Sequence, residues 1–283
     1  MTKYSKCLVC DSPMLPAKLQ GLLRCEHCQF VTADMNLSKE DLQNLYATNY
    51  FQGGEYVDYL AEEPSLTHNF FRRLDTLLRL LPKHQAYNLF EVGCAFGFFL
   101  DLARPYFSNV AGCDISKAAI SHARKMYKLN VYEDEFTAIK NSPTYDLICM
   151  WDTIEHIKHP DQYVSHAANI LSENGLIALT TGNIGSLNAK FRGPRWRMIH
   201  PPTHLHYFNK KSMFHLLERH NFEVIHFEHP SVARSIQFIL GKVIPDGRIK
   251  DFIMEQLTRT GLADFKLSIN LFDIMYVIAR KVR

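Results

Sequence analysis

The stretch "NLFEVGCAFGFFLDLA", residues 88–103, decides the fold. Its first half is an apolar run typical of a short buried strand, and its second half, from about Phe98, is typical of a helix. Gly93 and Gly97 fall at the turn between the two halves. Glycines at such a turn let backbone N–H groups approach a ligand closely, although a tight turn also needs glycine for its conformation alone. The stretch therefore predicts the first strand–loop–helix unit of an α/β domain.

Short apolar runs and helical segments alternate along the rest of the chain. The runs "NVAGCDIS", "LNVYEDEF", "YDLICMW" and "GLIALTTGN" are typical of strands, whereas "KAAISHARKMY" and "PDQYVSHAANILSEN" are typical of helices. This alternation predicts a Rossmann-like, doubly wound and mostly parallel sheet over residues 86–283. Two insertions, residues 184–209 and 230–268, interrupt the domain, and we expect the first to be irregular. "FDIMYVIARKV" is predicted to be the last strand.

The residues before this domain fall into two segments. Residues 36–85 are predicted to form a helical linker or lid, with Ser38 as a helix N-cap and Asp41 as its acidic partner. Within this segment, "SLTHNFFRRLDTLLRLLP" has apolar residues at helical spacing and ends at Pro82. Residues 1–35 are predicted to be a separate cysteine-containing module.

Four of the seven cysteines form two Cys-x2-Cys pairs near the N-terminus, Cys7 with Cys10 and Cys25 with Cys28. Two such pairs can place four thiolates around one ion, which is the tetrahedral shell of a structural zinc site. So short a segment cannot bury enough core to fold alone, and metal binding would supply the missing stability. We therefore predict a zinc ribbon over residues 1–35, with His27 outside the ligand shell.

Acidic residues follow the next two predicted strands. Asp114 ends "NVAGCDIS", where a carboxylate can accept hydrogen bonds from ribose hydroxyls, and Asp134 and Glu135 follow "LNVYEDEF". A dinucleotide-binding loop requires G-x-G-x-x-G, whereas this loop reads E-x-G-x-x-x-G. A further acidic position that could accept from an adenine amino group also favours S-adenosylmethionine over a nicotinamide dinucleotide.

Together these segments resemble the class I S-adenosylmethionine-dependent methyltransferases, specifically the bacterial group with an N-terminal zinc ribbon. The resemblance extends from residue 7 to about residue 225. It rests on the four cysteines and on "LYATNYF", "EVGCAFGFFL", "GCDIS", "MWDTIEHIKHPDQY" and "HLHYF".

The resemblance implies a role for each matching residue. Glu91, Gly93 and Gly97 would hold the methionine part of the cofactor, together with Ala95, which stands where many relatives have glycine. Asp114 would bind the ribose. The remaining implied cofactor residues are Asp134 or Glu135 near the adenine, Tyr46 and Tyr50 on a helical lid, and Trp151 and Asp152 at the floor of the site.

The segment "CMWDTIEHIKHP" places Glu155 and His156 after the fourth predicted strand. Methyl transfer to oxygen or nitrogen requires alignment of the acceptor and removal of its proton, and a histidine such as His156 could take that proton. Alternatively, Glu155 and His156 only order the loop. The ubiquinone-pathway O-methyltransferases share the "EH" dipeptide, and there the region is linked with metal binding, which leaves a second metal as an alternative.

The segment "HPPTHLHYFN", residues 200–209, ends the first insertion. We predict that His204 and His206 form the wall of the active site and that one of them contacts the acceptor or acts as the base. His200, which precedes two prolines, is predicted to be structural, and Asn209 to be the N-cap of the next helix. The alternative is that these histidines only order the loop.

The insertions are expected to determine the acceptor. Lys190, Arg192, Arg195 and Arg197 surround Trp196, which suggests an anionic, ring-bearing acceptor such as a phosphorylated sugar, a nucleotide-sugar or a lipid-linked intermediate. The alternative is a solvated loop. The second insertion could be a dimer face or a membrane-surface helix. The predicted function is methyl transfer to a small-molecule, sugar-nucleotide, glycan or quinone-like acceptor.

Two other functions remain open at this level. An RNA methyltransferase could hold nucleic acid with its ribbon, but the ribbon offers only Lys18 and Arg24 between its first cysteine pair and Phe30, and the net charge is only +3. A nucleic-acid partner is therefore not expected. The other alternative is an inactive scaffold that binds the cofactor. The N-terminus lacks an apolar leader and no run is long enough to span a membrane, so we predict a cytoplasmic protein; the oligomeric state stays open.

Overall fold

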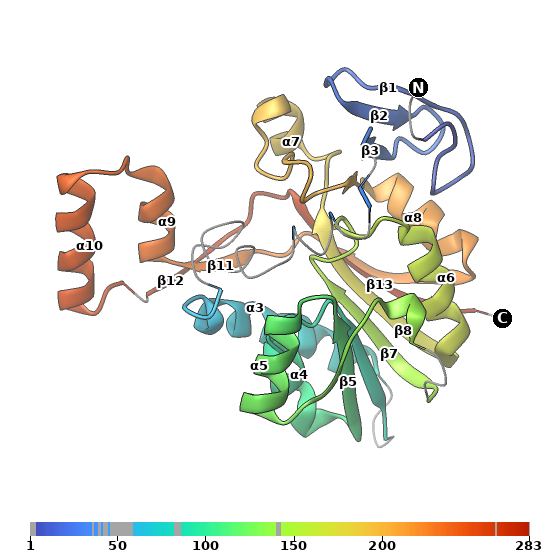
Figure 1. Ribbon diagram of the computed structural model, residues 1–283, viewed down its shortest axis with the longest axis horizontal. Coiled ribbons are helices and arrows are strands. Elements are labelled where there is room, and N and C mark those ends of the chain that lie inside the picture. Colours follow the sequence, from blue (N-terminus) through green and yellow to red (C-terminus); the bar gives the residue numbers. More distant parts are fainter. Residues whose placement is uncertain are drawn as a thin grey trace.

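The computed structural model describes residues 4–35, 37–38, 41, 45, 59–81, 86–139, 143–263 and 265–282. It contains a large α/β sheet with helices on both faces, a small antiparallel sheet near the N-terminus, and a projecting arm (Figure 1). The predicted lid residues Tyr46 and Tyr50 lie outside the described residues.

The large sheet has seven strands in the order β10-β13-β8-β7-β4-β5-β6. The strands β6, β5, β4, β7 and β8 run parallel to one another, whereas β13 is antiparallel to both β8 and β10. This order confirms the predicted Rossmann-like, mostly parallel sheet, including its last strand. The strands span Asn88–Val92 (β4), Asn109–Asp114 (β5), Asn130–Glu133 (β6), Tyr145–Trp151 (β7), Leu171–Gly182 (β8), Phe222–Glu228 (β10) and Ile274–Lys281 (β13).

Helices cover both faces because the strands are apolar on both sides. In β4, Leu89 packs into one core cluster and Phe90 into the other, since successive side chains point to opposite faces. The cluster around Leu89 includes residues of α3, α4 and α5, and the cluster around Phe90 includes residues of α6 and α8. These helices span Glu63–Leu80 (α3), Phe98–Ala103 (α4), Lys117–Tyr127 (α5), Pro160–Ile170 (α6) and Lys210–Arg219 (α8).

Two predicted helix starts are confirmed by their hydrogen bonds. The backbone N–H of Asp41 donates to Ser38 Oγ at 3.1 Å, and that of Ser38 donates to the Asp41 carboxylate at 2.7 Å. At the start of α8, Asn209 Oδ1 accepts from the Ser212 N–H while Ser212 Oγ accepts from the Asn209 N–H, both at 3.0 Å. Each pair is a reciprocal cap that satisfies donors at the helix N-terminus.

The small sheet joins the N-terminal module to the first insertion. Its order is β1-β2-β3-β9, with β1 at Met14–Pro16, β2 at Leu22–Cys25, β3 at Val31–Ala33 and β9 at His206–Tyr207. The first insertion also contains the helix α7, Leu187–Arg192, and a 3-10 turn at Gly193–Arg195. The expectation of an irregular insertion is therefore wrong. Ser186 caps α7 and the exposed edge of β3 gives β9 a partner, and neither feature has an apolar periodicity that a sequence pattern would reveal.

The second insertion forms the projecting arm seen at the left of Figure 1. Strands β11, Val232–Ser235, and β12, Lys266–Ile269, pair antiparallel, and helices α9, Ile236–Val243, and α10, Arg248–Thr260, lie at its end. No helix within the described part of the chain is long and apolar enough to cross a membrane.

Candidate active site

The loops that follow the parallel strands meet at one edge of the sheet. Residue pairing aligns Val92 with Cys113 and Met150, near the carboxyl ends of β4, β5 and β7. Asp114 in turn aligns with Glu133 at the end of β6. The sheet therefore brings together the glycine loop and the acidic residues that the sequence predicted as a cofactor site, at the position where α/β sheets bind ligands.

The glycine loop has a backbone that side chains would obstruct. Gly93 has φ +71° and Gly97 has φ +87°, and a Cβ atom would come within 2.6 Å of Thr153 at the first position and of Leu129 at the second. Ala95 has φ +45°, which is also left-handed and explains why glycine is suited to its position. Gly97 is the residue before α4, so the helix N-terminus opens onto this loop.

Asp114 fixes the loop in place. One carboxylate oxygen accepts from the Ala95 N–H at 2.9 Å, and the other accepts from the Ser116 N–H at 2.8 Å. Burial raises the pKa of Asp114, and these backbone hydrogen bonds oppose the rise. Because each carboxylate oxygen has a second lone pair, Asp114 can still accept hydrogen bonds from two ligand hydroxyls.

Glu91 is the buried acid behind the loop. Its side chain is 2% exposed, and within the described residues its Oε2 atom has no hydrogen-bond partner. Burial, and then the negative charge of Asp114, raise its pKa well above the usual value. A buried carboxyl oxygen without a partner is unfavourable on its own. It suits a ligand with a cationic group, such as the ammonium or sulfonium of S-adenosylmethionine.

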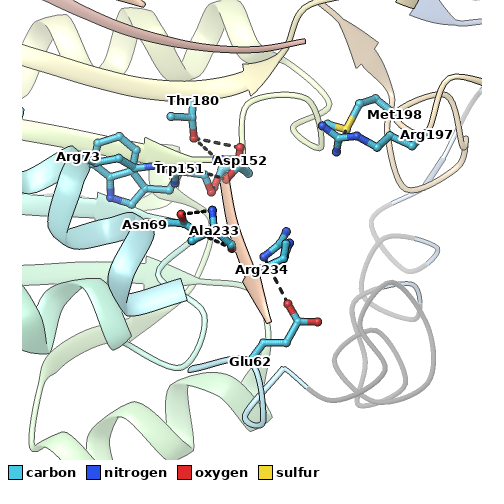
Figure 2. Close-up of polar contacts among 11 residues, drawn as sticks. Glu62, Asn69, Arg73, Trp151, Asp152, Thr180, Arg197, Met198, Ala233 and Arg234 are labelled. Atoms are coloured by element: carbon cyan, nitrogen blue, oxygen red, sulfur yellow. Dashed lines mark hydrogen bonds and ion pairs between the residues drawn. The ribbon is translucent and has the colours of Figure 1, made fainter. Parts of the chain in front are cut away.

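Arg73, which the sequence reading missed, adds a positive charge beside this acid. Its guanidinium lies 3.0 Å from Asp152 and stacks over the Trp151 ring at 5.3 Å, and only 9% of its side chain is exposed (Figure 2). Thr180 Oγ1 donates a further hydrogen bond to Asp152 at 3.0 Å. The sequence does contain a signal for this role. Arg73 stands three residues after Phe70, which places an arginine on the apolar face of α3.

The acids after β6 are more open. Asp134 is exposed and accepts from the Glu135 N–H at 2.8 Å, and Glu135 is partly buried. Both follow the strand end at the same sheet edge as Asp114.

Glu155, His156 and His204 form a second group of polar side chains on this edge. One ligand atom from each lies within 4.8 Å of those of the other two. His156 Nδ1 lies 2.8 Å from the Thr203 carbonyl, and His204 Nδ1 lies 2.9 Å from the Met198 carbonyl. A carbonyl only accepts, so each Nδ1 carries the hydrogen and each Nε2 keeps a lone pair.

The charges of this group follow from its burial. Burial lowers the pKa of His156 to about 4. Burial, and then the charge of Asp152, raise the pKa of Glu155 to about 8. Within the described residues neither oxygen of Glu155 has a partner in hydrogen-bonding geometry. Two neutral imidazoles and a buried carboxyl can accept or pass a proton, and they are also a donor set that a divalent cation accepts.

The structure separates the three predicted catalytic histidines. His156 and His204 lie together, with ring centroids 4.6 Å apart, and the His200 ring packs against that of His204 in a tilted arrangement, with centroids 3.9 Å apart. His206 lies instead against the N-terminal module, with its Nδ1 2.9 Å from Thr32 Oγ1 and its ring 5.4 Å from that of Phe30.

The predicted metal cluster is confirmed as a geometric site. All four cysteine sulfurs lie within 4.8 Å of one another. Cys7 Sγ is 3.5 Å from Cys28 Sγ, and Cys10 Sγ is 3.5 Å from Cys25 Sγ. This spacing fits a tetrahedral zinc ion, and four thiolates would complete its shell.

The basic cluster of the first insertion differs from the prediction at its centre. Trp196 is 1% exposed and donates from Nε1 to Asp273 at 2.9 Å, so its ring is part of a core and cannot face an acceptor. Arg197 also pairs with Asp273, at 2.9 Å. Lys190, Arg192 and Arg195 remain exposed.

Two curated proteins match parts of the chain. Ubiquinone biosynthesis O-methyltransferase of Dictyostelium discoideum is 31% identical over 34% of this chain and 35% of that protein. A probable S-adenosylmethionine-dependent methyltransferase of Mycolicibacterium smegmatis is 26% identical over 61% of this chain and 65% of that protein. The chain thus spans less than two thirds of either relative.

Solved structures share the fold. Magnesium protoporphyrin IX methyltransferase from Synechocystis, solved with bound SAH, superposes with a TM-score of 0.57 at 11% identity, covering 87% of this chain and all of that one. The YcgJ protein of Bacillus subtilis gives 0.53 at 11% identity, covering 75% of this chain and 99% of that one. Residues 66–227, more than half of the chain, match the methyltransferase domain family. The chain therefore belongs to this methyltransferase family.

Proposed function

We propose that the protein transfers a methyl group from S-adenosylmethionine to a small-molecule acceptor. The observation that carries this proposal is the buried Oε2 atom of Glu91, which has no hydrogen-bond partner among the described residues and lies behind a glycine loop that Asp114 fixes through the Ala95 N–H. Family membership supports it, as do relatives named for ubiquinone biosynthesis and magnesium protoporphyrin. Acceptors in the proposed range are small molecules, sugar nucleotides, glycans and quinone-like rings.

The proposed cofactor contacts follow the sheet edge. Glu91 would face the cationic part of the methionine moiety, and the backbone of residues 93–97 would surround it. Arg73 would attract the carboxylate of the same moiety, since its charge lies close to Glu91 and Asp152. Asp114 would accept from the ribose and Asp134 or Glu135 from the adenine. The roles of Tyr46 and Tyr50 in a lid stay predictions.

On the acceptor side, we propose that the group of Glu155, His156 and His204 holds the acceptor and receives its proton. The bound cofactor supplies an electrophilic methyl group, so the residues need only align the acceptor and remove a proton. His156 is neutral near pH 7, and its Nε2 can accept. A neighbouring carboxyl that deprotonates would stabilise the resulting imidazolium. His206 would support this group from the ribbon side.

A divalent cation at the same three residues is the second candidate, because two Nε2 atoms and a carboxyl form a donor set whose histidines are already oriented by carbonyls. Metal analysis of purified protein distinguishes a proton-accepting group from a bound divalent cation. One ion per chain fits the ribbon alone, whereas a second ion that His204→Ala removes would support the cation.

The four cysteines are proposed to hold a structural zinc ion. An RNA acceptor is less favoured, because the ribbon supplies only two cations between its first cysteine pair and Phe30, and its β3 edge is occupied by β9. Binding to RNA that falls steeply with added salt would restore that alternative. The cytoplasmic location stays a prediction.

The decisive experiment is calorimetry with S-adenosylmethionine, after mass spectrometry of any ligand that co-purifies. Binding in the micromolar range followed by methyl transfer in a screen of sugar nucleotides, quinone precursors and RNA would support the proposal. Absence of cofactor binding would contradict it, and binding without transfer to any acceptor would favour the inactive scaffold.

A further inference from the structure

Helix α7 carries two large apolar side chains that project into solvent. Leu187 is 83% exposed and Phe191 is 93% exposed, more than any other large hydrophobic residue among the described residues. They stand four residues apart and so share one face of the helix. Ala189, on the opposite face, is buried. The helix therefore presents its apolar face outward.

The segment that carries this face has basic residues and no acidic ones. Residues 184–209 contain four lysines and arginines and no aspartate or glutamate. Lys190, Arg192 and Arg195 are exposed beside the two apolar side chains, and only Arg197 has an acidic partner, Asp273, within the described residues. We call Leu187, Lys190, Phe191, Arg192 and Arg195 the α7 patch.

The α7 patch stands on a firmly held base. Asp273 is 1% exposed and accepts from Asn188 at 2.7 Å and from Trp196 at 2.9 Å, and Ser186 Oγ accepts from the Ala189 N–H at 3.0 Å. The projection is thus a built feature of the insertion. Figure 1 shows α7 standing clear of the large sheet, on the same side as the small N-terminal sheet.

The chemistry of the α7 patch selects among binding partners. Apolar side chains that project beyond a ring of cations can enter the boundary between headgroups and acyl chains while the cations meet lipid phosphates. A nucleic acid would use the cations but not Leu187. The arm offers a contrast, because Ile249 and Phe252 on α10 are also exposed, at 74% and 62%, but acidic and basic residues alternate around them.

We propose that the α7 patch docks the protein on the surface of an anionic lipid bilayer. The insertion that carries the α7 patch also carries His204, so docking would bring the acceptor-side group close to that surface. If the proposed methyl transfer holds, on which this second step rests, the acceptor is a lipid-linked or membrane-associated molecule presented at the headgroup level.

Sedimentation with lipid vesicles tests the docking and requires neither cofactor nor acceptor. The full chain is expected to bind vesicles of phosphatidylcholine mixed with phosphatidylglycerol, to bind phosphatidylcholine alone much more weakly, and to lose binding as salt rises. Phe191→Ser should lower the partition coefficient about tenfold or more, since one buried aromatic side chain is lost from the interface. Lys190→Glu should lower it several-fold and weaken its salt dependence.

Phe252→Ser on α10 is the matched control, because it removes an exposed phenylalanine from a surface of mixed charge. It should leave vesicle binding unchanged, and the thermal midpoints of both serine variants should match that of the wild type. Equal loss in Phe252→Ser, or no binding of the wild type to anionic vesicles, would overturn the proposal. So would self-association that Phe191→Ser abolishes, which would assign the α7 patch to a second copy of the chain.

Methyl transfer and docking can fail separately. Vesicle binding by a protein that does not bind S-adenosylmethionine would contradict the proposed function and leave the docking surface intact. Cofactor binding without vesicle binding would contradict the docking surface and leave the proposed function intact.

Discussion

Thr32 of the N-terminal module and His206 of the first insertion are in direct contact, with Thr32 Oγ1 2.9 Å from His206 Nδ1. Both side chains are buried, and Thr32 Oγ1 also donates to the Leu205 carbonyl at 3.2 Å. The N–H groups of Leu205 and His206 in turn donate to the Glu155 carbonyl, at 2.9 and 3.1 Å. The ribbon therefore helps to fix the position of the acceptor-side group.

Thr32→Val is expected to weaken this connection. The change keeps the side-chain volume but leaves the buried His206 nitrogen without the hydroxyl, and such a loss costs about 1–3 kcal/mol. Denaturant unfolding should show that decrease, and the imidazole NMR signals of His204 and His206 should shift. Thr32→Ser keeps the hydroxyl and should leave the imidazole signals close to those of the wild type. If Thr32→Val kept the wild-type stability and the wild-type imidazole signals, the contact would not stabilise the fold or position the histidines.

Removal of the metal from the cysteine cluster should impair methyl transfer more than cofactor binding. The ribbon cysteines pack in the same core cluster as α8, on the sheet face away from α4 and the glycine loop. Cys25→Ser should abolish stoichiometric zinc, lower the thermal midpoint and reduce the rate of transfer. Calorimetry should still detect S-adenosylmethionine at any temperature where the sheet remains folded.

Cys94→Ala is the control for this change. Cys94 is equally buried but belongs to the glycine-loop side of the core, outside the cysteine cluster. The Cys94→Ala variant should keep one zinc ion per chain, as measured by mass spectrometry. Retention of zinc by Cys25→Ser would exclude the four-cysteine site.

Much of the sheet and the cofactor side could be predicted from the sequence, for physical reasons. A parallel sheet brings the carboxyl ends of its strands to one edge, so glycines and acids that follow successive strands become neighbours whatever the loops do. Gly93, Gly97 and Asp114 meet in this way. The cysteine pairs were equally predictable, because each pair closes a local turn.

The acceptor side was less predictable because its contacts are long-range. Thr32 and His206 are 174 positions apart, and a two-residue strand such as β9 carries no periodicity. That pairing separates His206 from His204, although both stand in the same short segment. The burial of Trp196 depends in the same manner on Asp273, 77 positions away, whereas the four nearby cations had suggested that the ring takes part in binding an acceptor.

Asp114→Ala is expected to weaken the binding of S-adenosylmethionine about tenfold or more. The variant removes a hydrogen-bond acceptor for the ribose and also releases the Ala95 N–H, and charge-assisted hydrogen bonds contribute about 1.5–3 kcal/mol each. Calorimetry measures the affinity. Asp101→Ala, which removes the partly exposed partner that α4 offers to Arg104, should leave the affinity unchanged. Unaltered affinity in Asp114→Ala would refute the cofactor assignment.

Two changes in the glycine loop should affect stability differently. Gly97→Ala places a Cβ 2.6 Å from Leu129 at a φ of +87°, so it should destabilise the fold by about 1–2 kcal/mol from the left-handed conformation alone. Ala95→Gly relieves a φ of +45° and should be neutral or slightly stabilising. Chemical denaturation of both variants gives the comparison. Equal destabilisation would mean that the Ala95 methyl group packs more favourably than its backbone angle costs.

Asp273 should make the first insertion sensitive to acid. Burial tends to raise its pKa, but the Trp196 hydrogen bond and the charge of Arg197 hold the pKa below the usual value. A carboxylate with a lowered folded-state pKa stabilises the protein above its unfolded pKa of about 3.9, and this contribution disappears as the pH falls through the folded-state value. In a Trp151→Phe background, the emission of Trp196 should therefore change below about pH 4.

Asp273→Asn should lower the stability by about 1–3 kcal/mol at pH 7 and flatten this acid dependence, because its amide binds no proton. Asp246→Asn, at an exposed ion pair on the arm, should alter neither quantity, and an unchanged acid transition in Asp273→Asn would assign the transition to another group.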